Sequence, residues 1–366
     1  MPSDFPHTDE AGQDTRFNAA LVLLQEALKA KAFPACSLAV THHGRLLLLR
    51  SLGQFTFDAG SQQVTNDNLF DIASITKVVA TTAMAMVLYE RGLLDLDTPV
   101  VALVPEFASS ADVRRNEVTL RMLLAHSSGL PAYAKLYLQA RTPQELLTIA
   151  FQIELTADPG ARAEYSDIGF IVLGVALARI ADEPLEMFCR REILGPLGMV
   201  STTFNPAASL GSTCVPTAND QEFRHRIIQG EVQDENTSVL GGVAGHAGLF
   251  STARDLSVFA LAMLSAGNSV VRPDTLSLFT SRQMAPHGTS RALGWDTPSA
   301  PSQSGRYFSG RSFGHLGYTG TSLWIDAEKV LSIVLLTNRT WPDCKNQGIR
   351  QVRPQIHDAI VEALEK

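Results

Sequence analysis

Residues 69–92 read LFDIASITKVVATTAMAMVLYERG, and this stretch decides the fold. Its first five residues, Leu69–Ala73, predict a short extended segment that leads into Ser74. From Ser74 to Arg91 the nearly uncharged pattern predicts a buried helix, because serine can cap a helix start and Gly92 follows the expected end. The sequence therefore predicts a serine at a junction between an extended segment and a helix.

Both ends of the chain predict strands. Ala35–Thr41 and Arg45–Ser51 are apolar runs separated by a short polar turn, which is the pattern of a β-hairpin. Near the other end, Val330–Asn338 is a nearly continuous apolar run, typical of a strand that is buried on both faces. The spacing of apolar residues predicts flanking helices at Phe17–Lys31 and Gln355–Leu364.

The middle of the chain predicts helices, with Pro and Gly between them. These helical segments are Pro143–Phe151, Ile168–Ile180 and Pro184–Leu194. We therefore expect a mixed α/β (α+β) domain from residues 1–75 plus 241–366, with an antiparallel sheet flanked by helices. An all-helical domain, residues 76–240, is expected as an insertion in it.

The composition excludes several classes of protein. Of the 366 residues, 45% are hydrophobic and 18% are charged, which suits a globular chain with a large core rather than a disordered one. The net charge of −7 repels a phosphate backbone, so we expect no nucleic-acid partner. Four scattered cysteines lack the spacing of metal ligands and predict ordinary buried thiols.

No membrane span is expected. The longest uncharged apolar runs, Val78–Tyr89 and Ile168–Ala178, are shorter than the roughly 20 residues that cross a bilayer. Residues 1–16 are polar and acidic, without the features of an export signal. The sequence as written predicts a cytoplasmic protein, and a periplasmic or extracellular one only if a leader has been removed. It leaves the oligomeric state open.

The sharpest chemical signal is the Ser-x-x-Lys pattern of Ser74 and Lys77. Residues three apart on a helix share a face, so the lysine amine can reach the serine hydroxyl. The positive end of the helix would lower the pKa of the amine, and the amine would help to activate the serine as a nucleophile. The alternative is a capping serine beside a solvated lysine. The apolar surroundings favour a buried Lys77.

A second signal is Tyr165-Ser166-Asp167, which precedes an apolar helix. A phenol beside an ammonium can shuttle protons, because the positive charge stabilises the phenolate. Alternatively, Tyr165 is a half-buried aromatic residue, and Ser166 or Asp167 caps the helix.

The third signal is GHLGYTGTS at residues 314–322, which leads into a strand at Leu323–Asp326. Glycines in such a segment often mark the close approach of a ligand to the backbone. A strand edge there can donate a backbone N–H to an oxyanion. A glycine-rich turn without a catalytic role is the alternative.

Together, Ser-x-x-Lys, Tyr-x-Asp and His-x-Gly in this order resemble the serine β-lactamase and penicillin-binding protein superfamily. The chain is most similar to its class C-like branch, which includes class C β-lactamases, D-alanyl-D-alanine carboxypeptidases and family VIII carboxylesterases. The resemblance spans about residues 17–362 and includes LLAHSSGLP at 123–131 and GHAGLFS at 245–251. It implies a β-lactamase-like fold with the active site in the cleft between the two domains.

The resemblance also implies roles for individual residues. Ser74 matches the acylated nucleophile, Lys77 matches its amine partner, and Tyr165 matches the general base of the branch. His315-Leu316-Gly317 stands where the family usually has Lys-Thr-Gly. The oxyanion hole would consist of the backbone N–H groups of Ser74 and Tyr318. No metal and no cofactor is implied.

Asp167 and His315, which with Gly317 are expected to contact substrate, depart from the family pattern. Asp167 replaces a neutral asparagine, and we expect it to pair with Lys77 and raise the pKa of the amine. His315 replaces a lysine, so it would carry a charge only below its usual titration near pH ~6.5. A substrate carboxylate would then bind better as the pH falls. Both departures point away from an efficient β-lactamase.

Other polar residues are expected to be structural. His126 and His246 lie beside glycines and could line the cleft, but structural roles are favoured. Asp234, Glu235 and Asn236 lie together but lack further ligands at suitable spacing, so a loop or helix cap is favoured over a metal site.

The sequence thus predicts a serine hydrolase that forms an acyl-enzyme on Ser74 and acts on small esters or amides. One alternative is a D-amino-acid peptidase, a D-alanyl-D-alanine carboxypeptidase or a weak β-lactamase. An alternative of another class is a catalytically silent relative that binds cell-wall peptide or a partner protein. The expected ligand in each hydrolytic case is a small molecule or a peptide.

Overall fold

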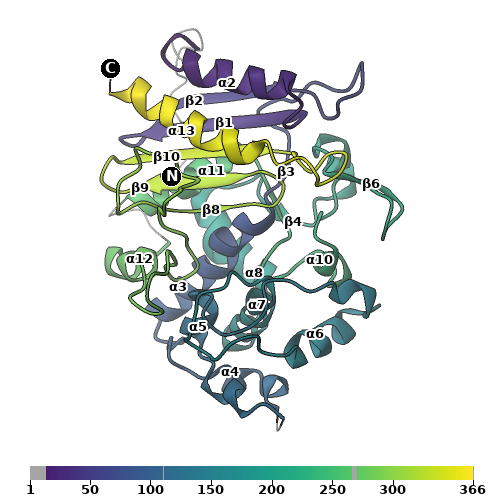
Figure 1. The fold of residues 1–366 in the computed structure, drawn as a ribbon, viewed down its shortest axis with the longest axis vertical. Coiled ribbons are helices and arrows are strands. Elements are labelled where there is room, and N and C mark those ends of the chain that lie inside the picture. The colour runs from purple at the N-terminus through teal and green to yellow at the C-terminus, as the bar shows by residue number, and fades with distance from the viewer. Residues whose placement is uncertain (1–13, 110, 266–269, 366) are drawn as a thin grey trace.

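Strands from both ends of the chain form one antiparallel sheet in the computed structural model, which describes residues 14–109, 111–265 and 270–365. The strand order is β2-β1-β10-β9-β8. Figure 1 shows helices α2 and α13 side by side over one face of this sheet, with α11 on the opposite face. The strands of the sheet are β1 (Ala35–His42), β2 (Arg45–Gly53), β8 (Phe313–Leu316), β9 (Ser322–Asp326) and β10 (Leu331–Thr337).

The centre of the sheet is buried on both sides, which explains why β10 is apolar throughout. Its Ile333 and Leu335 pack in a cluster with α2 and α13, whereas Val334 and Leu336 pack in the cluster that contains α11. In β1, Leu38 lies opposite Leu335 in the register. The predicted fold class, an antiparallel sheet flanked by helices and built from both chain ends, is confirmed.

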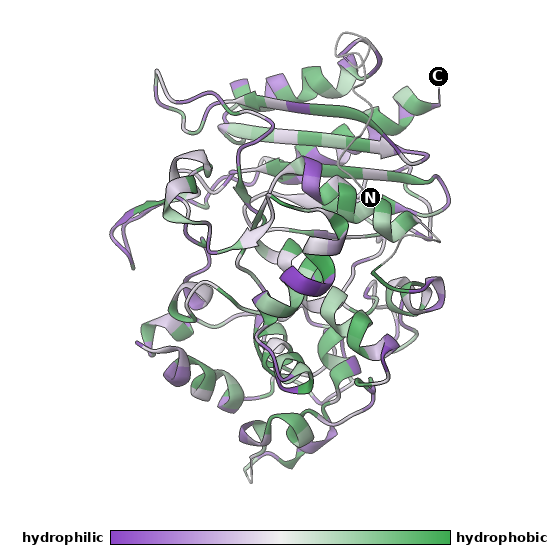
Figure 2. Cartoon of the chain, turned by 180° about the vertical axis from the view of Figure 1, so that it is seen from behind, coloured by the Kyte–Doolittle hydropathy of each residue, from purple (hydrophilic) through white to green (hydrophobic). Residues whose placement is uncertain are grey.

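Most helices lie below the sheet in Figure 1, between the segment around Ser74 and the C-terminal strands in sequence. Figure 2 shows hydrophobic residues concentrated in the strands and in the helices at the centre of the molecule. The helices are α2 (Asn18–Lys29), α3 (Ala83–Glu90), α4 (Val100–Leu103), α5 (Leu120–Leu124), α6 (Pro143–Gln152), α7 (Asp167–Ala181), α8 (Leu185–Cys189), α9 (Gly195–Leu197), α10 (Glu235–Val239), α11 (Ala253–Leu264), α12 (Pro273–Thr280) and α13 (Ile349–Leu364).

Short strands also lie outside the large sheet. One, at residues 70–71, falls in the extended segment predicted at Leu69–Ala73, and those at 203–204, 218–220 and 226–228 interrupt the middle of the chain, where the sequence predicted helices alone. They form one three-stranded and one two-stranded sheet, because single segments of two or three residues pair across loops. These strands are β3 (Phe70–Asp71), β4 (Thr203–Phe204), β5 (Ala218–Asp220), β6 (Arg226–Ile228) and β7 (Leu249–Ser251).

The segment after Ser74 is not one regular α-helix, and Ser74 does not cap it. Ser74 lies inside a 3₁₀ turn, Ala73–Ile75, which is followed by a π-helical turn, Lys77–Thr82, and then by α3. The Asp71 carboxylate accepts the Ala73 N–H at 2.8 Å, and Ala73 has a φ of +46°. The Asp71 side chain, rather than that of Ser74, therefore accepts the first backbone N–H of the turn.

The predicted strand at Leu323–Asp326 is present as β9, and β8 precedes it across the glycine-rich turn. Two further predictions were wrong in detail. The last helix begins at Ile349 rather than Gln355, since Ile349 and Arg353 are buried on its inner face despite Pro354. Cys344 is exposed, whereas the other three cysteines are buried.

No helix among residues 14–109, 111–265 and 270–365 has the length and apolar character needed to cross a membrane. The expectation about export signals falls almost entirely on residues outside these ranges.

Leu335→Ala should lower the free energy of unfolding by about 2–5 kcal/mol, because it opens a cavity in the strand at the centre of the sheet. Val22→Ala, an exposed residue on α2, is the control and should change stability by less than about 0.5 kcal/mol. Urea unfolding of both variants measures the difference. Equal stabilities would contradict the assignment of this core.

Candidate active site

The side chains of Ser74 and Lys77 meet at the start of the helical segment. Lys77 Nζ donates to Ser74 Oγ at 3.1 Å, to Asp167 Oδ1 at 2.6 Å and to the carbonyl oxygen of His246 at 3.1 Å. The lysine side chain is completely buried. Its three acceptors match the three N–H donors of an ammonium. The structure therefore holds Lys77 in its charged form against the serine hydroxyl.

The pKa of Lys77 is raised, not lowered as the position in a helix suggested. Burial alone would lower the pKa of the amine, but the Asp167 carboxylate and Tyr165 outweigh burial. The expected ion pair between Asp167 and Lys77 is present, and it has the expected effect. A carboxylate in direct contact has a larger effect than the partial charge of a short helix end.

Tyr165 lies next to both groups and is kept as a neutral phenol. The Lys77 ammonium is 4.9 Å from the centre of its ring. Burial and the charge of Asp167 raise the pKa of Tyr165, whereas Lys77 and a hydrogen bond with Ser74 lower it by less. The Lys77 ammonium lowers the pKa of the phenol, as expected, but burial, followed by the charge of Asp167, outweighs this effect and keeps the phenol protonated in the resting site.

Two hydrogen bonds join the turn between β8 and β9 to the segment that precedes Ser74. Thr319 Oγ1 donates to the carbonyl oxygen of Asp71 at 2.8 Å, and Thr321 Oγ1 donates to that of Ile72 at 3.2 Å. A Cβ on Gly317 would lie 1.9 Å from Thr321 Oγ1, so only glycine fits at this approach. These contacts fix the backbone at Tyr318 relative to the backbone at Ser74.

His315 is buried on β8 and does not titrate as the sequence suggested. Its Nδ1 donates to the carbonyl oxygen of Leu316 at 2.7 Å. Burial, followed by the nearby charges of Lys77 and Arg291, lowers the pKa of His315 well below 6.5. The imidazole therefore stays neutral near pH 6.5, and the expected gain in carboxylate binding as the pH falls through that range is not supported.

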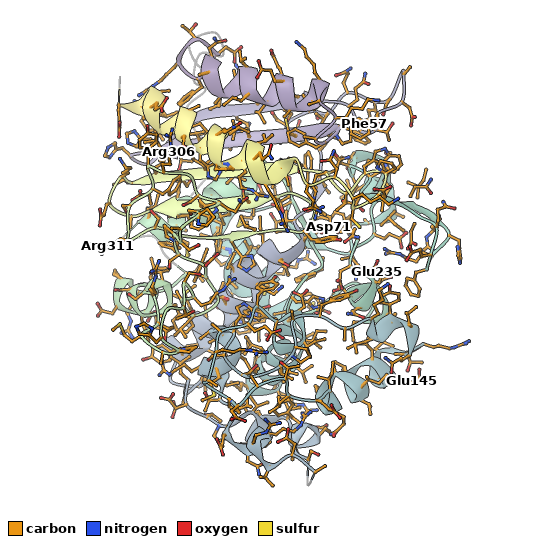
Figure 3. All side chains as sticks on the ribbon, in the orientation of Figure 1. Phe57, Asp71, Glu145, Glu235, Arg306 and Arg311 are labelled. Atoms are coloured by element: carbon orange, nitrogen blue, oxygen red, sulfur yellow. The ribbon has the colours of Figure 1, made fainter. Side chains whose placement is uncertain are left out.

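One cavity of about 860 Å³ lies over these groups. Asp71 and Glu235, which both line it, lie between the sheet and the helices below in Figure 3. All the site residues expected from the sequence line this cavity except Lys77, which is buried behind Ser74. They are Ser74, Tyr165, Asp167, His315, Gly317 and Tyr318.

A model of the family described as "Beta-lactamase" matches residues 22–353 of the chain. The chain belongs to the beta-lactamase family.

Curated relatives within this family differ in their names. The chain is 32% identical over 351 residues to an "N-acetylmuramyl-L-alanine amidase" of Bacillus subtilis strain 168. The alignment covers 85% of this chain and 78% of that protein. It is 31% identical over 309 residues to a "Putative D-alanyl-D-alanine carboxypeptidase" of Escherichia coli strain K12, with 76% and 70% covered.

A solved structure shares the fold. It is EstCE1, described as "a hydrolase with promiscuous acyltransferase activity", with a TM-score of 0.78 at 21% identity. The similarity covers 96% of this chain and 99% of EstCE1. The beta-lactamase family to which the chain belongs thus includes proteins named as amidases and peptidases, and the same fold carries a further hydrolase.

The remaining polar candidates have separate structural contacts in this member of the beta-lactamase family. His246 lines the cavity, and its Nε2 lies 2.9 Å from Asp234 Oδ1. Asp234 caps α10 by accepting the Thr237 N–H at 2.7 Å, and Asn236 bonds the backbone of the segment around Tyr137. The residues that the structure describes contain no group of three potential metal ligands.

Two ionisable residues that line the cavity, Asp71 and Arg291, were not predicted from the sequence. Asp71 is buried, and its second carboxylate oxygen accepts the Gln233 N–H at 2.7 Å. Its only sequence signal is an acidic residue inside an apolar run before the Ser-x-x-Lys pattern. Arg291 lies with its guanidinium 5.4 Å from the Tyr165 ring and lines the cavity. It comes from the loop between α12 and β8, and no local pattern marks it.

Asp167→Asn should shift the rising limb of kcat/KM against pH to lower pH by about 1 unit or more. Removing a carboxylate in direct contact lets both Lys77 and Tyr165 lose protons more easily, and such contacts change a pKa by roughly 1–3 units. The asparagine oxygen can still accept from Lys77, so the fold should persist. Hydrolysis of p-nitrophenyl butyrate across the neutral and alkaline range measures the profile.

Asp158→Asn is the matched control, because this carboxylate is exposed and pairs with Arg114, at 2.8 Å, outside the site. It should leave the profile unchanged. An unchanged profile in Asp167→Asn as well would mean that the Lys77 and Tyr165 protons do not control the rate.

Proposed function

We propose that the protein is a serine hydrolase that forms an acyl-enzyme on Ser74. The observation that carries the proposal is the 3.1 Å contact of the buried Lys77 amine with the Ser74 hydroxyl, at the wall of the cavity. A surface Ser-x-x-Lys pattern would leave the lysine in water. Membership of a family with hydrolytic members supports the same conclusion.

In the first half of the reaction, Ser74 Oγ attacks the substrate carbonyl carbon and an oxygen–carbon bond forms. The serine proton passes to the couple of Lys77 and Tyr165, which must first have released one proton, because at rest both are protonated. Tyr165 then gives a proton to the leaving alcohol or amine as its bond to the carbonyl breaks. The result is an ester of Ser74 with the acyl group.

In the second half, water attacks the carbonyl carbon of that ester and passes a proton to the same two groups. They return this proton to Ser74 Oγ as the bond between Oγ and the acyl carbon breaks, and the acid is released. The backbone N–H groups of Ser74 and Tyr318 hold the oxyanion in both halves. The hydrogen bonds of Thr319 and Thr321 to the segment before Ser74 support this role, because they keep the two backbones in register.

The substrate class is a small ester or amide, with His315, Gly317 and Asp167 forming part of its binding wall. His315 is neutral and Asp167 is an acceptor, so neither attracts a substrate carboxylate. The cation that lines the cavity near Tyr165, Arg291, lies 3.7 Å from Asp296, which offsets its charge. The name of the Bacillus subtilis relative supports amide hydrolysis, and the description of EstCE1 as a hydrolase with acyltransferase activity supports transfer of an acyl group.

The domain division at residues 1–75 plus 241–366 and 76–240 fits this site. Ser74 then lies at a boundary, and Tyr165 and Tyr318 reach the cavity from different domains. A cleft between domains is a common position for a site that must admit substrate and assemble groups from both sides.

Ser74→Ala should abolish turnover of p-nitrophenyl butyrate and labelling by a fluorophosphonate probe, because both need the serine oxygen. The fold should be retained, since alanine adds no bulk to the 3₁₀ turn. Ser281→Ala, an exposed serine after α12, is the control and should be labelled like the wild type. Full activity in a folded Ser74→Ala protein would refute the nucleophile, and with it the proposed mechanism.

The enzyme should prefer esters to β-lactams. We expect kcat/KM for p-nitrophenyl butyrate to exceed that for nitrocefin by at least about tenfold, because nitrocefin carries a carboxylate that His315 and Asp167 do not attract. A panel that adds a D-alanyl-D-alanine peptide and N-acetylmuramyl-L-alanine compares the alternatives. Nitrocefin turnover equal to ester turnover would favour a β-lactamase instead.

A further inference from the structure

His126 stands in a backbone conformation that normally selects glycine. It follows α5 with a φ of +55°, in the left-handed region. Its N–H donates to the Leu123 carbonyl, and the Ser127 N–H donates to that of Met122, which together form a Schellman motif. Glycine, or next asparagine, is the usual residue at this position. A histidine here is strained, and its side chain is 2% exposed.

His126 accepts hydrogen bonds from both residues that flank Tyr165 in the chain. Its Nδ1 accepts the Ser166 N–H at 3.0 Å, and its carbonyl oxygen accepts the Glu164 N–H at 2.8 Å. Because Nδ1 accepts, the ring proton is on Nε2. Hydrogen bonds on either side leave the backbone at Tyr165 little freedom to move.

The imidazole ring also packs against the phenol itself. Its centre is 4.7 Å from that of the Tyr165 ring and 5.0 Å from that of the Phe170 ring. Burial, followed by the charges of Arg291 and Lys77, lowers the pKa of His126 well below 6.5. The ring therefore stays neutral, and Nδ1 remains an acceptor throughout the working range of pH.

We propose that His126 is the positioning residue for Tyr165, and that it acts through the hydrogen bond from the Ser166 N–H to Nδ1 and through the packing of its ring on the phenol. Backbone strain at a buried residue beside reacting groups is a common sign of such a role. His126 does not line the cavity, so it holds the phenol without touching substrate. The inference rests on the proposed function, in which Tyr165 carries protons.

Two amide substitutions separate the Nδ1 bond from a general structural role. In His126→Asn the amide oxygen takes the place of Nδ1, and asparagine tolerates the left-handed backbone. In His126→Gln the side-chain oxygen takes the place of Nε2 and cannot accept from Ser166. Both variants lose the ring, and both are polar, so they differ chiefly in this one bond.

With p-nitrophenyl butyrate, we expect His126→Asn to keep kcat within about fivefold of the wild type. In His126→Gln, kcat should fall by about 20-fold or more, since a small displacement of a catalytic group has a large effect on rate. KM should change by less than about threefold in both, because the phenol acts on proton transfer rather than on substrate holding. Tyr165→Phe gives the reference loss, and it should exceed the loss in His126→Gln.

Equal losses in the asparagine and glutamine variants, or a glutamine variant as active as the wild type, would overturn the proposal. Thermal unfolding of both variants tests whether they fold, and His126→Gly provides a version in which the helix end is relaxed but the acceptor is absent. That variant should be folded and as slow as His126→Gln. A fast His126→Gly would also overturn the role of the Nδ1 bond.

The failure of this inference is distinct from the failure of the proposed function. If Ser74→Ala stays active, the acyl-enzyme mechanism is wrong whatever His126 does. If Ser74→Ala and Tyr165→Phe are inactive while the His126 variants do not differ from one another, the mechanism stands and only the positioning role fails.

Discussion

The buried ion pair of Lys77 and Asp167 is the interaction on which the site depends. An ammonium without a partner at full burial is strongly unfavourable, and removing one partner of such a pair costs about 3–5 kcal/mol. Lys77 comes from the segment after the nucleophile, and Asp167 begins α7, so the pair joins two parts of the chain that are 90 residues apart. The same carboxylate raises the pKa of Lys77 and adds to the effect of burial on the pKa of Tyr165. One contact therefore affects both stability and protonation at the site.

Much of the architecture could be predicted from local patterns. The strands near both chain ends are short apolar runs, which are typical of strands that are buried in a sheet. In β10, for example, every residue is buried. The helix at Asp167–Ala181 has a capping serine and a long apolar face. The region around Ser74 could not be predicted in detail, because its turn depends on a bond from the side chain of Asp71 to the Ala73 N–H. Such a bond leaves no periodic signal.

The same limit applies to the site. Ser74, Lys77, Tyr165 and the turn near Tyr318 could be found because each carries a short motif. The effect of Asp167 on the pKa of Lys77 could also be predicted, but the raised pKa of Tyr165 and the lowered pKa of His315 could not, because they result from burial and charges that the fold brings together. Arg291 is an example: it lowers the pKa of both His126 and His315 from a loop without any motif. The pKa of Tyr165 is raised because burial and the charge of Asp167 together outweigh the effect of Lys77.

The hydrogen bonds of Thr319 and Thr321 to the carbonyls of Asp71 and Ile72 also join a segment that is synthesised early to one that is synthesised late. The ribosome makes the nucleophile early and the β8–β9 turn late. A nascent chain that ends before this turn has Ser74 and Lys77 but no backbone partner at Tyr318 for the oxyanion. It also lacks β10, the strand between β1 and β9. In the proposed mechanism, therefore, the oxyanion site is complete only once the final strands have joined the sheet.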